Sequence, residues 1–265
     1  MGKRILFVCF FVMSFMTLSC FLSCVSSKQG IGQSVLTVGT NATYPPYEYV
    51  NEKGLVEGFD IDLAEAIGKK LNKQVVIKEF GFDCLILNVK KGKIDMAIAG
   101  MSITPERQKE VAMIPYQGDT MKELAVIFWK NVPNDNPSSL SQYPSIAVQV
   151  STFQERFVTE AVAGSKNTNV KSFDSTVELV MEIKYGKSAV AVMEPTVARL
   201  MQEKFPDLKI VTIPIPEDQW TLGNGIVVAK NNVALIKAIE KALEELNLEG
   251  VIANLEKKWG LSVAV

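Results

Sequence analysis

The sequence predicts an α/β protein whose parallel sheets carry helices on both faces. Two observations lead to this fold class. Short apolar runs alternate with helical patterns from Val35 onward, which is typical of βαβ units. Two segments, 92-GKIDMAIAG-100 and 186-GKSAVAVME-194, also echo each other, because each places a glycine and a lysine before a buried strand. The echo indicates two lobes of similar topology.

The spacing of apolar residues predicts the individual elements. Leu63, Ile67 and Leu71 fall on one face of a helix over Asp60–Leu71, since residues four apart lie above one another. The other expected elements are, in chain order, strands Val35–Gly39, Val75–Ile77, Ile94–Ala99 and Ile146–Val150, helix Thr176–Lys184, strand Ala189–Met193, helix Thr196–Lys204 and strand Lys209–Ile213.

The division into lobes follows from these elements. Asn131–Tyr143, rich in Asn, Pro and Ser, is predicted to be a surface loop of the second lobe. Two crossings between the lobes are needed, and we expect them near Lys122–Val126 and Thr221–Val227. The first lobe would then comprise residues 35–122 and 222–265, and the second lobe residues 123–221.

The composition is that of a globular protein with little net charge. The 265 residues include 28 lysines and arginines against 29 aspartates and glutamates, a formal net charge of −1, so no basic field would recruit nucleic acid. There is no histidine, which removes the commonest general base and the commonest zinc ligand. We therefore expect no metal, no cofactor and no catalytic residues.

The N-terminus indicates export. Residues 1–24 place two basic residues before an apolar run that is too short for a membrane span, which predicts a signal peptide. Cys20 and Cys24 each end a segment similar to a lipoprotein cleavage site, and plain cleavage to a soluble product is the alternative. A flexible tether is expected over residues 25–34. Cys84 is expected to pack as a small hydrophobic residue.

Four segments resemble, in the family's order, the periplasmic solute-binding proteins of polar amino-acid ABC transporters: 40-TNATYPPYEYVNEKGLVEGFDIDLAEAIGKKL-71, 80-FGFDCLI-86, 98-IAGMSITPERQ-108 and 149-QVSTFQE-155. The resemblance implies the two-lobed type II fold of such proteins, with a mixed, mostly parallel sheet in each lobe and two crossover hinge strands. It also implies a monomer in the periplasm or cell envelope that delivers its ligand to a permease in the inner membrane.

Arg107 is the residue that local structure explains least. Thr104 and Pro105 are well suited to begin a helix, but a cation in the first turn opposes the helix dipole. The resemblance implies that Arg107 forks onto the α-carboxylate of a bound amino acid, a charge-assisted pair. The alternative is a surface arginine that reaches Glu110.

Several further residues belong to the same expected site. Ser102 and Thr152 are similar to family residues that meet the carboxylate, although both are also ordinary helix-capping residues. Glu194 stands where the family usually has an aspartate for the α-ammonium, and Ala189 replaces a nearby acid. The remaining residues expected around the ligand backbone are Ala99, Gly100, Met101 and Phe153.

The ligand side chain is expected to meet a second group of residues. Tyr44 and Phe82 would offer two ring faces, which suit a flat, weakly hydrated cation. Glu48 would supply a counter-charge, and Asn41 and Gln149 would add acceptor oxygens. Tyr44 could instead be a core aromatic, and Asn41 in place of the family's frequent aspartate leaves a neutral ligand such as glutamine possible.

These expectations favour a protein that binds L-arginine by closure of two lobes. The alternatives are a binder of lysine, ornithine, histidine or glutamine, an exported dehydratase on the same scaffold, and a sensory or adhesin-like receptor. The absence of histidine argues against the enzyme.

Overall fold

The computed structural model describes residues 34–133 and 139–261. The expected signal peptide, most of the expected tether, and the two cysteines proposed for acylation, Cys20 and Cys24, lie outside this part of the chain. Over the part that the structure describes, no helix is both long and apolar enough to span a membrane.

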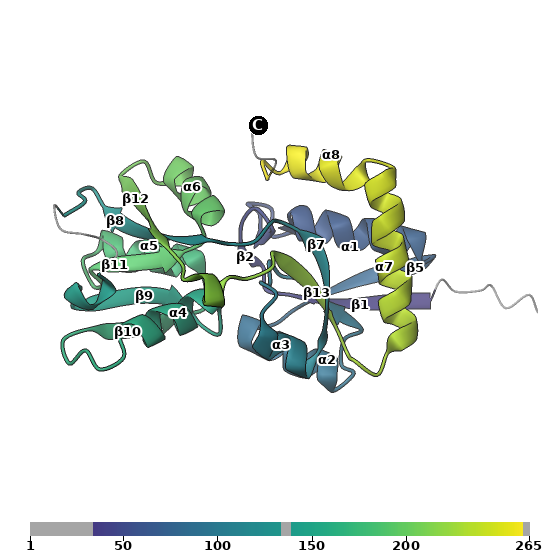
Figure 1. Ribbon diagram of the computed structural model, residues 1–265. Coiled ribbons are helices and arrows are strands. Elements are labelled where there is room, and N and C mark those ends of the chain that lie inside the picture. The colour runs from purple at the N-terminus through teal and green to yellow at the C-terminus, as the bar shows by residue number, and fades with distance from the viewer. Residues whose placement is uncertain (1–33, 134–138, 262–265) are drawn as a thin grey trace, which may run out of the picture. The chain divides into compact units, whose positions relative to one another are not determined.

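One sheet is built from the two ends of the described chain (Figure 1). Its strand order is β5-β1-β6-β13-β7, with β1 at Ser34–Thr40, β5 at Lys73–Glu79, β6 at Met96–Ala97, β7 at Ala112–Gln117 and β13 at Asn224–Val228. Three helices share a core with one face, namely α1 (Phe59–Lys70), α7 (Val233–Leu248) and α8 (Val251–Lys258). The opposite face packs against α2 (Leu85–Lys90), and α3 (Pro105–Glu110) contacts β7.

Alternation along the chain explains how this sheet is covered on both faces. Met96 and Ile98 belong to the core shared with α1, whereas Ala97 and Ala99 belong to the core shared with α2. Successive side chains of a strand point to opposite faces, so a continuous apolar run is needed when both faces are buried.

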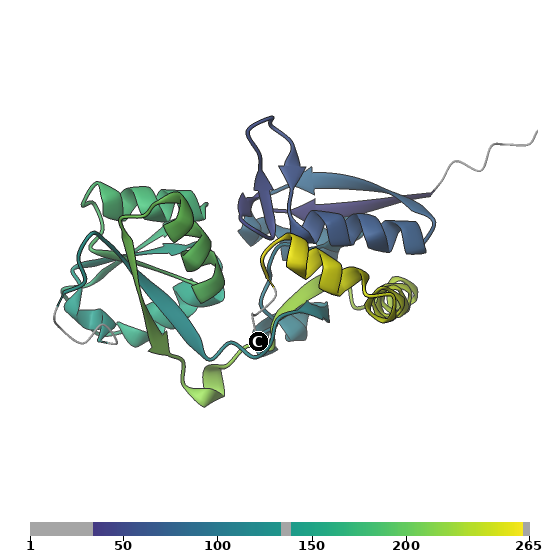
Figure 2. The same cartoon turned by 90° about the horizontal axis from the view of Figure 1, so that it is seen from above.

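The second sheet is built from the middle of the chain. Its strand order is β10-β9-β11-β8-β12, with β8 at Glu123–Trp129, β9 at Ser145–Gln149, β10 at Asn169–Phe173, β11 at Val190–Met193 and β12 at Leu208–Pro214. Helices α5 (Thr176–Lys184) and α6 (Pro195–Lys204) pack on one face and α4 (Phe153–Ala161) on the other (Figures 1 and 2).

A small three-stranded sheet accompanies the first sheet. It comprises β2 (Thr43–Tyr44), β3 (Glu48–Val50) and β4 (Val56–Glu57), paired antiparallel. Single 3-10 turns lie at Phe82–Cys84, Leu140–Gln142 and Glu217–Gln219.

The two large sheets have the same topology, as the sequence echo predicted. When the strand that arrives from the other sheet is left out of the count, the first described strand of each sheet lies between the second and the third. The arriving strand, β13 or β8, lies between the third and the last. The prediction of a mixed, mostly parallel sheet is confirmed, because four of the five described strands in each sheet run in the same direction. The exception is the arriving strand, β8 or β13, which runs antiparallel to both of its neighbours.

The crossings between the sheets lie slightly before the predicted positions. The chain passes from β7 to β8 through residues 118–122 and returns from β12 to β13 through residues 215–223. Most of Lys122–Val126 and of Thr221–Val227 is instead paired within β8 and β13, because these apolar runs are central strands. The crossings contact each other where Met121 N donates to Thr221 O at 3.1 Å.

Two local expectations are corrected by the structure. Cys84 is exposed rather than packed, because it ends the turn Phe82–Cys84 and the next residue, Leu85, takes the buried position. The expected surface loop Asn131–Tyr143 places Leu140 and Tyr143 in the core of the second sheet, so only part of it is exposed.

Candidate functional site

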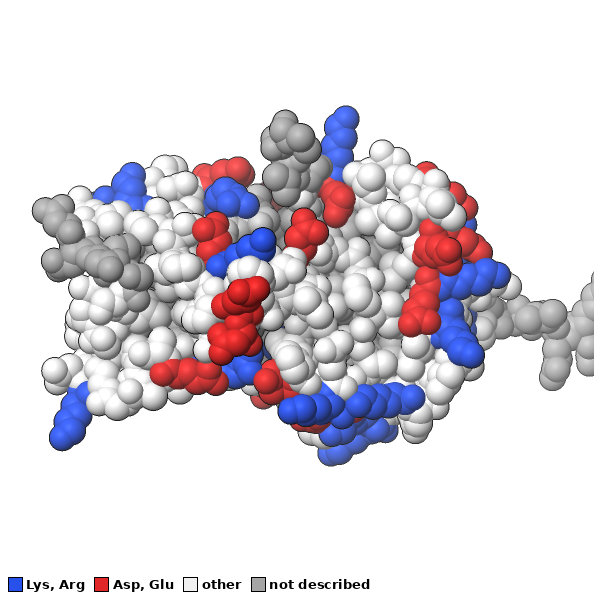
Figure 3. Space-filling view, viewed as in Figure 1, with Lys and Arg blue, Asp and Glu red and all other residues white. Residues whose placement is uncertain are grey.

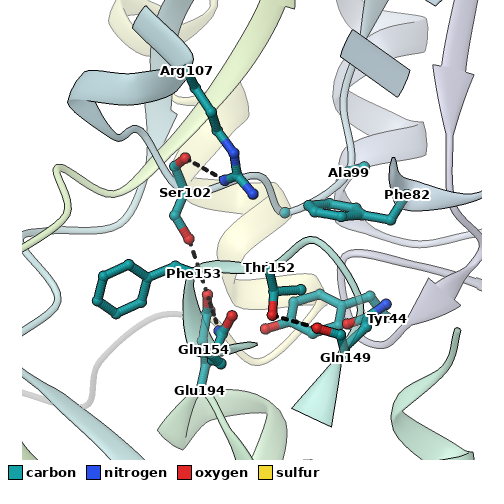
Figure 4. Close-up of a pocket in the computed structure, with 11 residues that line it drawn as sticks. Tyr44, Phe82, Ala99, Ser102, Arg107, Gln149, Thr152, Phe153, Gln154 and Glu194 are labelled. Carbon is teal, nitrogen blue, oxygen red and sulfur yellow. Dashed lines mark hydrogen bonds between the residues drawn. The ribbon is translucent and has the colours of Figure 1, made fainter. Parts of the chain in front are cut away.

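Side chains from both sheets surround one small pocket, with free room of about 10 Å³ (Figure 4). This room is that of about one water molecule, so a larger ligand requires the side chains around it to move apart. The pocket is lined by most of the residues predicted from the sequence and by one that was not predicted, namely Tyr44, Phe82, Ala99, Gly100, Ser102, Arg107, Gln149, Thr152, Phe153, Gln154 and Glu194.

Arg107 reaches this pocket from the first turn of α3. Thr104 caps the helix by accepting a hydrogen bond from Arg107 N at 3.3 Å. The guanidinium donates to two main-chain oxygens, Ser102 O at 2.7 Å and Ser151 O at 2.9 Å, and lies 5.4 Å from the centroid of the Phe82 ring. Figure 4 shows it directed toward the pocket.

The positive charge of Arg107 has no ion-pair partner among the described residues. No carboxylate there lies within 4.0 Å of the guanidinium, and Glu110, the alternative partner, instead pairs with Lys90 at 2.8 Å. Burial and the charge of Arg156 lower the pKa of Arg107 to about 10, so the group remains a cation at neutral pH. A partly buried cation held only by neutral oxygens is suited to receive an anion.

Glu194 lies across the pocket from Arg107, where β11 ends and α6 begins. Its Oε1 accepts hydrogen bonds from Gln154 Nε2 at 3.1 Å and from Ser102 Oγ at 3.4 Å (Figure 4). Burial raises the pKa of the Glu194 carboxyl, while these hydrogen bonds and the Arg107 charge act in the opposite direction. The residue is therefore a buried acid whose ionised form a cation would stabilise.

Thr152 has the local role that capping predicts. Its Oγ1 accepts from Glu155 N at 3.1 Å and donates to Gln149 O at 2.7 Å, so its one hydrogen is already donated within the second lobe. The start of α4 nevertheless borders the pocket through Thr152, Phe153 and Gln154. A helix N-terminus is an anion-binding feature in its own right, so both interpretations of Thr152 remain compatible.

The aromatic wall is formed by Tyr44 and supported by glycine. Tyr44 is buried and stacks on Tyr47 with ring centroids 5.8 Å apart. Gly100 has a positive φ of 51°, and a Cβ at this position would lie 3.0 Å from Tyr44 Cδ1. The absence of a side chain at Gly100 thus allows the ring to pack against main chain beside the pocket.

Three residues in the predicted set do not line the pocket. Glu48 is fully buried beneath it, because β3 pairs with β2 and the first turn of α1 covers the carboxyl. Met101 belongs to the core between the first sheet and α2. Asn41 lies beside the pocket and supports it, since its Oδ1 accepts from Gln149 Nε2 at 3.4 Å and its Nδ2 donates to Phe80 O at 3.0 Å.

Gln154 is the lining residue that the sequence interpretation missed. It occupies the first turn of α4, two residues after the capping Thr152, and its side chain is buried against Glu194. A polar residue in a helix's first turn is ordinary in itself. Burial of the Gln154 side chain is the feature that would have identified it as a site residue, and the periodicity of so short a helix does not reveal that burial.

The lining residues present one cation and one carboxylate, Arg107 and Glu194, on different sides of a closed space. This arrangement matches the carboxylate and ammonium of an amino-acid zwitterion. In the described residues no group of three or more His, Cys, Asp or Glu side chains could hold a metal ion.

The chain is similar to known proteins in sequence and in fold. The sequence profile of the bacterial extracellular solute-binding proteins, family 3, matches residues 36–262. Over 243 residues the chain is 48% identical to the probable ABC transporter arginine-binding protein ArtJ of Chlamydia trachomatis serovar D, an alignment that covers 92% of each protein.

Two solved structures are similar in fold and sequence. An ancestral arginine-binding protein bound to arginine has a TM-score of 0.76, and an ancestral arginine-binding protein bound to glutamine has a TM-score of 0.75. Each shares 36% sequence identity, over 86% of this chain and 99% of the other. The chain belongs to the bacterial extracellular solute-binding proteins of family 3.

Proposed function

We propose that this protein binds L-arginine outside the cytoplasm and delivers it to the permease of an ABC transporter. As a member of a solute-binding family it is an exported binding protein rather than an enzyme. The proposal for arginine is supported by the 48% identity to a protein named as arginine-binding and by the ancestral arginine-bound structure.

An amino-acid ligand is supported above all by the positions of Arg107 and Glu194, which lie on opposite sides of one pocket. The Arg107 guanidinium would pair with the ligand carboxylate in a bidentate arrangement, assisted by the N-terminus of α4. Glu194 would accept hydrogen bonds from the ligand ammonium. Burying both ligand charges is favourable only when each meets its partner, which predicts steep discrimination against molecules that lack one.

The side-chain end of the pocket is neutral. Among the described lining residues Glu194 is the one acid, so a guanidinium would rely on the Tyr44 ring and on amide and main-chain oxygens. Gln149 is a lining residue with such an amide oxygen, and its Nε2 donates to Asp174 O at 3.1 Å. A delocalised cation tolerates this better than a compact ammonium does, which favours arginine over lysine.

Glutamine is the second candidate ligand. The pocket lining has no second carboxylate beside Glu194, so no unpaired negative charge would disfavour the neutral side-chain amide of glutamine. The ancestral arginine-binding protein bound to glutamine supports the same possibility. We therefore expect arginine to bind more tightly than glutamine, but by a smaller factor than a paired counter-charge would produce.

Three accompanying proposals concern the whole protein. Residues 35–122 with 222–265 and residues 123–221 would act as lobes that close on the ligand. Cys20 or Cys24 would carry a lipid anchor after export, and the protein would act as a monomer with its permease in the inner membrane. No nucleic acid is expected among its partners.

Calorimetric titration of the ligand-stripped protein tests the proposal. Arginine, lysine, ornithine, histidine and glutamine would be titrated separately, with agmatine as the arginine analogue that lacks the carboxylate. We expect arginine to bind most tightly and agmatine not to bind measurably. Tighter binding of glutamine, or equal binding of agmatine, would contradict the arginine assignment or the carboxylate assignment respectively.

A further inference from the structure

Two acids lie buried against each other beneath the wall of the pocket. Glu48 begins β3 and Asp60 lies in the first turn of α1, and neither is exposed to solvent. Two main-chain hydrogen bonds dock the helix onto this strand, Asp60 N to Tyr47 O at 2.9 Å and Phe59 N to Pro46 O at 3.0 Å. The close approach of the two acids is therefore built into the backbone.

Asp60 has the contacts of an ionised carboxylate. Its Oδ2 accepts a hydrogen bond from Gly100 N at 2.7 Å, and both of its oxygens lie 2.9 Å from the Tyr116 hydroxyl. It also sits near the positive end of the α1 dipole. Within the described part of the chain its charge is thus stabilised by hydrogen-bond donors and not by a cation.

Glu48 has the contacts of a protonated acid. Neither of its oxygens receives a hydrogen bond from a donor group in the described residues, and the acid beside it is Asp60, to which a protonated Glu48 could donate a hydrogen bond. Two carboxylates can form such a bond only when one of them holds a proton. The arrangement leaves that proton on Glu48.

The titratable groups around the pair agree with this assignment. Glu48 faces Asp60 on α1, Glu194 at the start of α6, and the phenols of Tyr44, Tyr47 and Tyr116. Burial and the neighbouring acids Asp60 and Glu194 raise the pKa of Glu48 well above its ordinary value, while burial raises the pKa of Asp60 to about 6. At neutral pH the pair then holds a single proton.

The pair connects to the pocket through Gly100. This residue lines the pocket, its amide is bonded to Asp60, and its left-handed main chain packs against the Tyr44 ring. We propose that Glu48 is a positioning residue that keeps its proton, donates it to Asp60, and so fixes the Asp60 carboxylate that holds the Gly100 wall of the ligand pocket. The proposal rests on the ligand site described above and gives Glu48 no contact with the ligand.

Two matched substitutions test this role. Glu48→Gln keeps the size of the side chain and an N–H that can donate to Asp60, whereas Glu48→Met keeps the size and loses the donor. We expect Glu48→Gln to bind arginine within about threefold of wild type. Glu48→Met should lose at least about tenfold in affinity for arginine and for glutamine alike, because the wall serves every ligand.

A second measurement separates positioning from general stability. A protonated Glu48 must take up a proton on folding at pH 8, where the unfolded chain has it ionised, whereas Gln takes up none. We therefore expect Glu48→Gln to raise the midpoint of thermal unfolding at pH 8. The difference should disappear at pH 4, where the unfolded glutamate is itself largely protonated.

Each outcome decides one question. If Glu48→Gln lost affinity for arginine but not for glutamine, Glu48 would be a counter-charge for the ligand. If Glu48→Met kept wild-type affinity, the proposed hydrogen bond from Glu48 to Asp60 would be unimportant for binding. Either result overturns the proposal. If the wild type binds no arginine, the proposed ligand is wrong, but the comparison of unfolding midpoints still tests the protonation of Glu48. The same comparison decides the question if Glu48→Met does not fold.

Discussion

Arg107 enters the pocket with two of its donor groups already bonded to main-chain oxygens, one from each sheet. These bonds fix the plane of the guanidinium before any ligand arrives. A planar cation fixed in this way can present its remaining donors to a planar carboxylate with little loss of side-chain entropy. The side chain is a contact between the sheets, and under the proposed function it would also serve as the ligand partner.

Removal of the Arg107 cation should weaken the binding of all amino-acid ligands equally. Arg107→Ala is expected to lower affinity by about 3–5 kcal/mol, at least about 100-fold, because it leaves the ligand carboxylate buried without a partner. Arg107→Lys should recover only part of this loss, since a point charge cannot fork. Lys109→Ala, an exposed change on the same helix, is the control and should bind as wild type does in calorimetry.

Glu194 should give ligand binding a pH dependence. Only the ionised form attracts an ammonium, and the pKa of Glu194 is raised by burial, so affinity should begin to fall on acidification above the ordinary glutamate value of about 4.3. Glu194→Gln should weaken binding on the order of 100-fold and flatten this dependence. Arginine titrations between pH 5 and 8 measure both effects, and an unchanged slope in the variant would assign the titration to another group.

At the scale of elements, the start of α1 determines how the pocket wall is supported. The helix docks on the strand that contains Tyr47 and Glu48, and this contact is possible because Gly58 precedes the helix. Gly58 has a φ of 143°, and a Cβ there would lie 2.1 Å from Tyr47 O. No side chain fits between the helix and the strand at this point.

Gly58→Ala should therefore destabilise the protein and weaken ligand binding together. The strain of the backbone and the overlap with Tyr47 are expected to cost more than about 2 kcal/mol in urea unfolding. Gly54→Ala is a matched control, because Gly54 also has a positive φ, 76°, but a Cβ there would meet nothing within 4 Å. It should lose about 1 kcal/mol and bind arginine normally; equal effects of the two changes would refute the docking argument.

Elements with a strong local signal were predictable, and residues positioned by tertiary contacts were not. Helix Thr176–Lys184 has the predicted bounds, because Ser175 caps it and Leu179 and Ile183 repeat at helical spacing. Strand Ile94–Ala99 shrinks to Met96–Ala97, since pairing depends on neighbouring strands. The sequence also does not show which side of the small sheet Glu48 faces. Strand Glu48–Val50 has three residues, and so short a strand has too little alternation to show which face is buried.

At the scale of the whole molecule, the two sheets meet through contacts that involve no ligand. Glu106 on α3 pairs with Arg156 on α4 at 2.9 Å, and Thr176 Oγ1 at the start of α5 donates to Thr43 O at 3.0 Å. The ion pair is partly exposed, and such pairs contribute about 0–1 kcal/mol. Under the proposed closure, these contacts would favour the closed arrangement without fixing it, and the ligand would complete the closure.

Ligand-induced closure should be visible in solution. We expect small-angle scattering of the ligand-stripped protein to give a larger radius of gyration than the arginine-bound protein. Arg156→Gln should enlarge the ligand-free form further, with arginine affinity reduced by no more than about fivefold. Identical scattering curves with and without arginine would contradict closure.

The interleaved strand order also has a consequence for the order of folding during export. The second sheet needs only the uninterrupted stretch 123–214, whereas the first sheet lacks β13, the strand between β6 and β7, until residues 224–228 have emerged. Strand β7 pairs with β13, so its edge stays open while some hundred residues are delivered, a state prone to misassociation. We expect pulse-labelled hydrogen exchange during refolding to protect β9 and β11 before β7, and a chain ending at residue 221 to form only the second sheet.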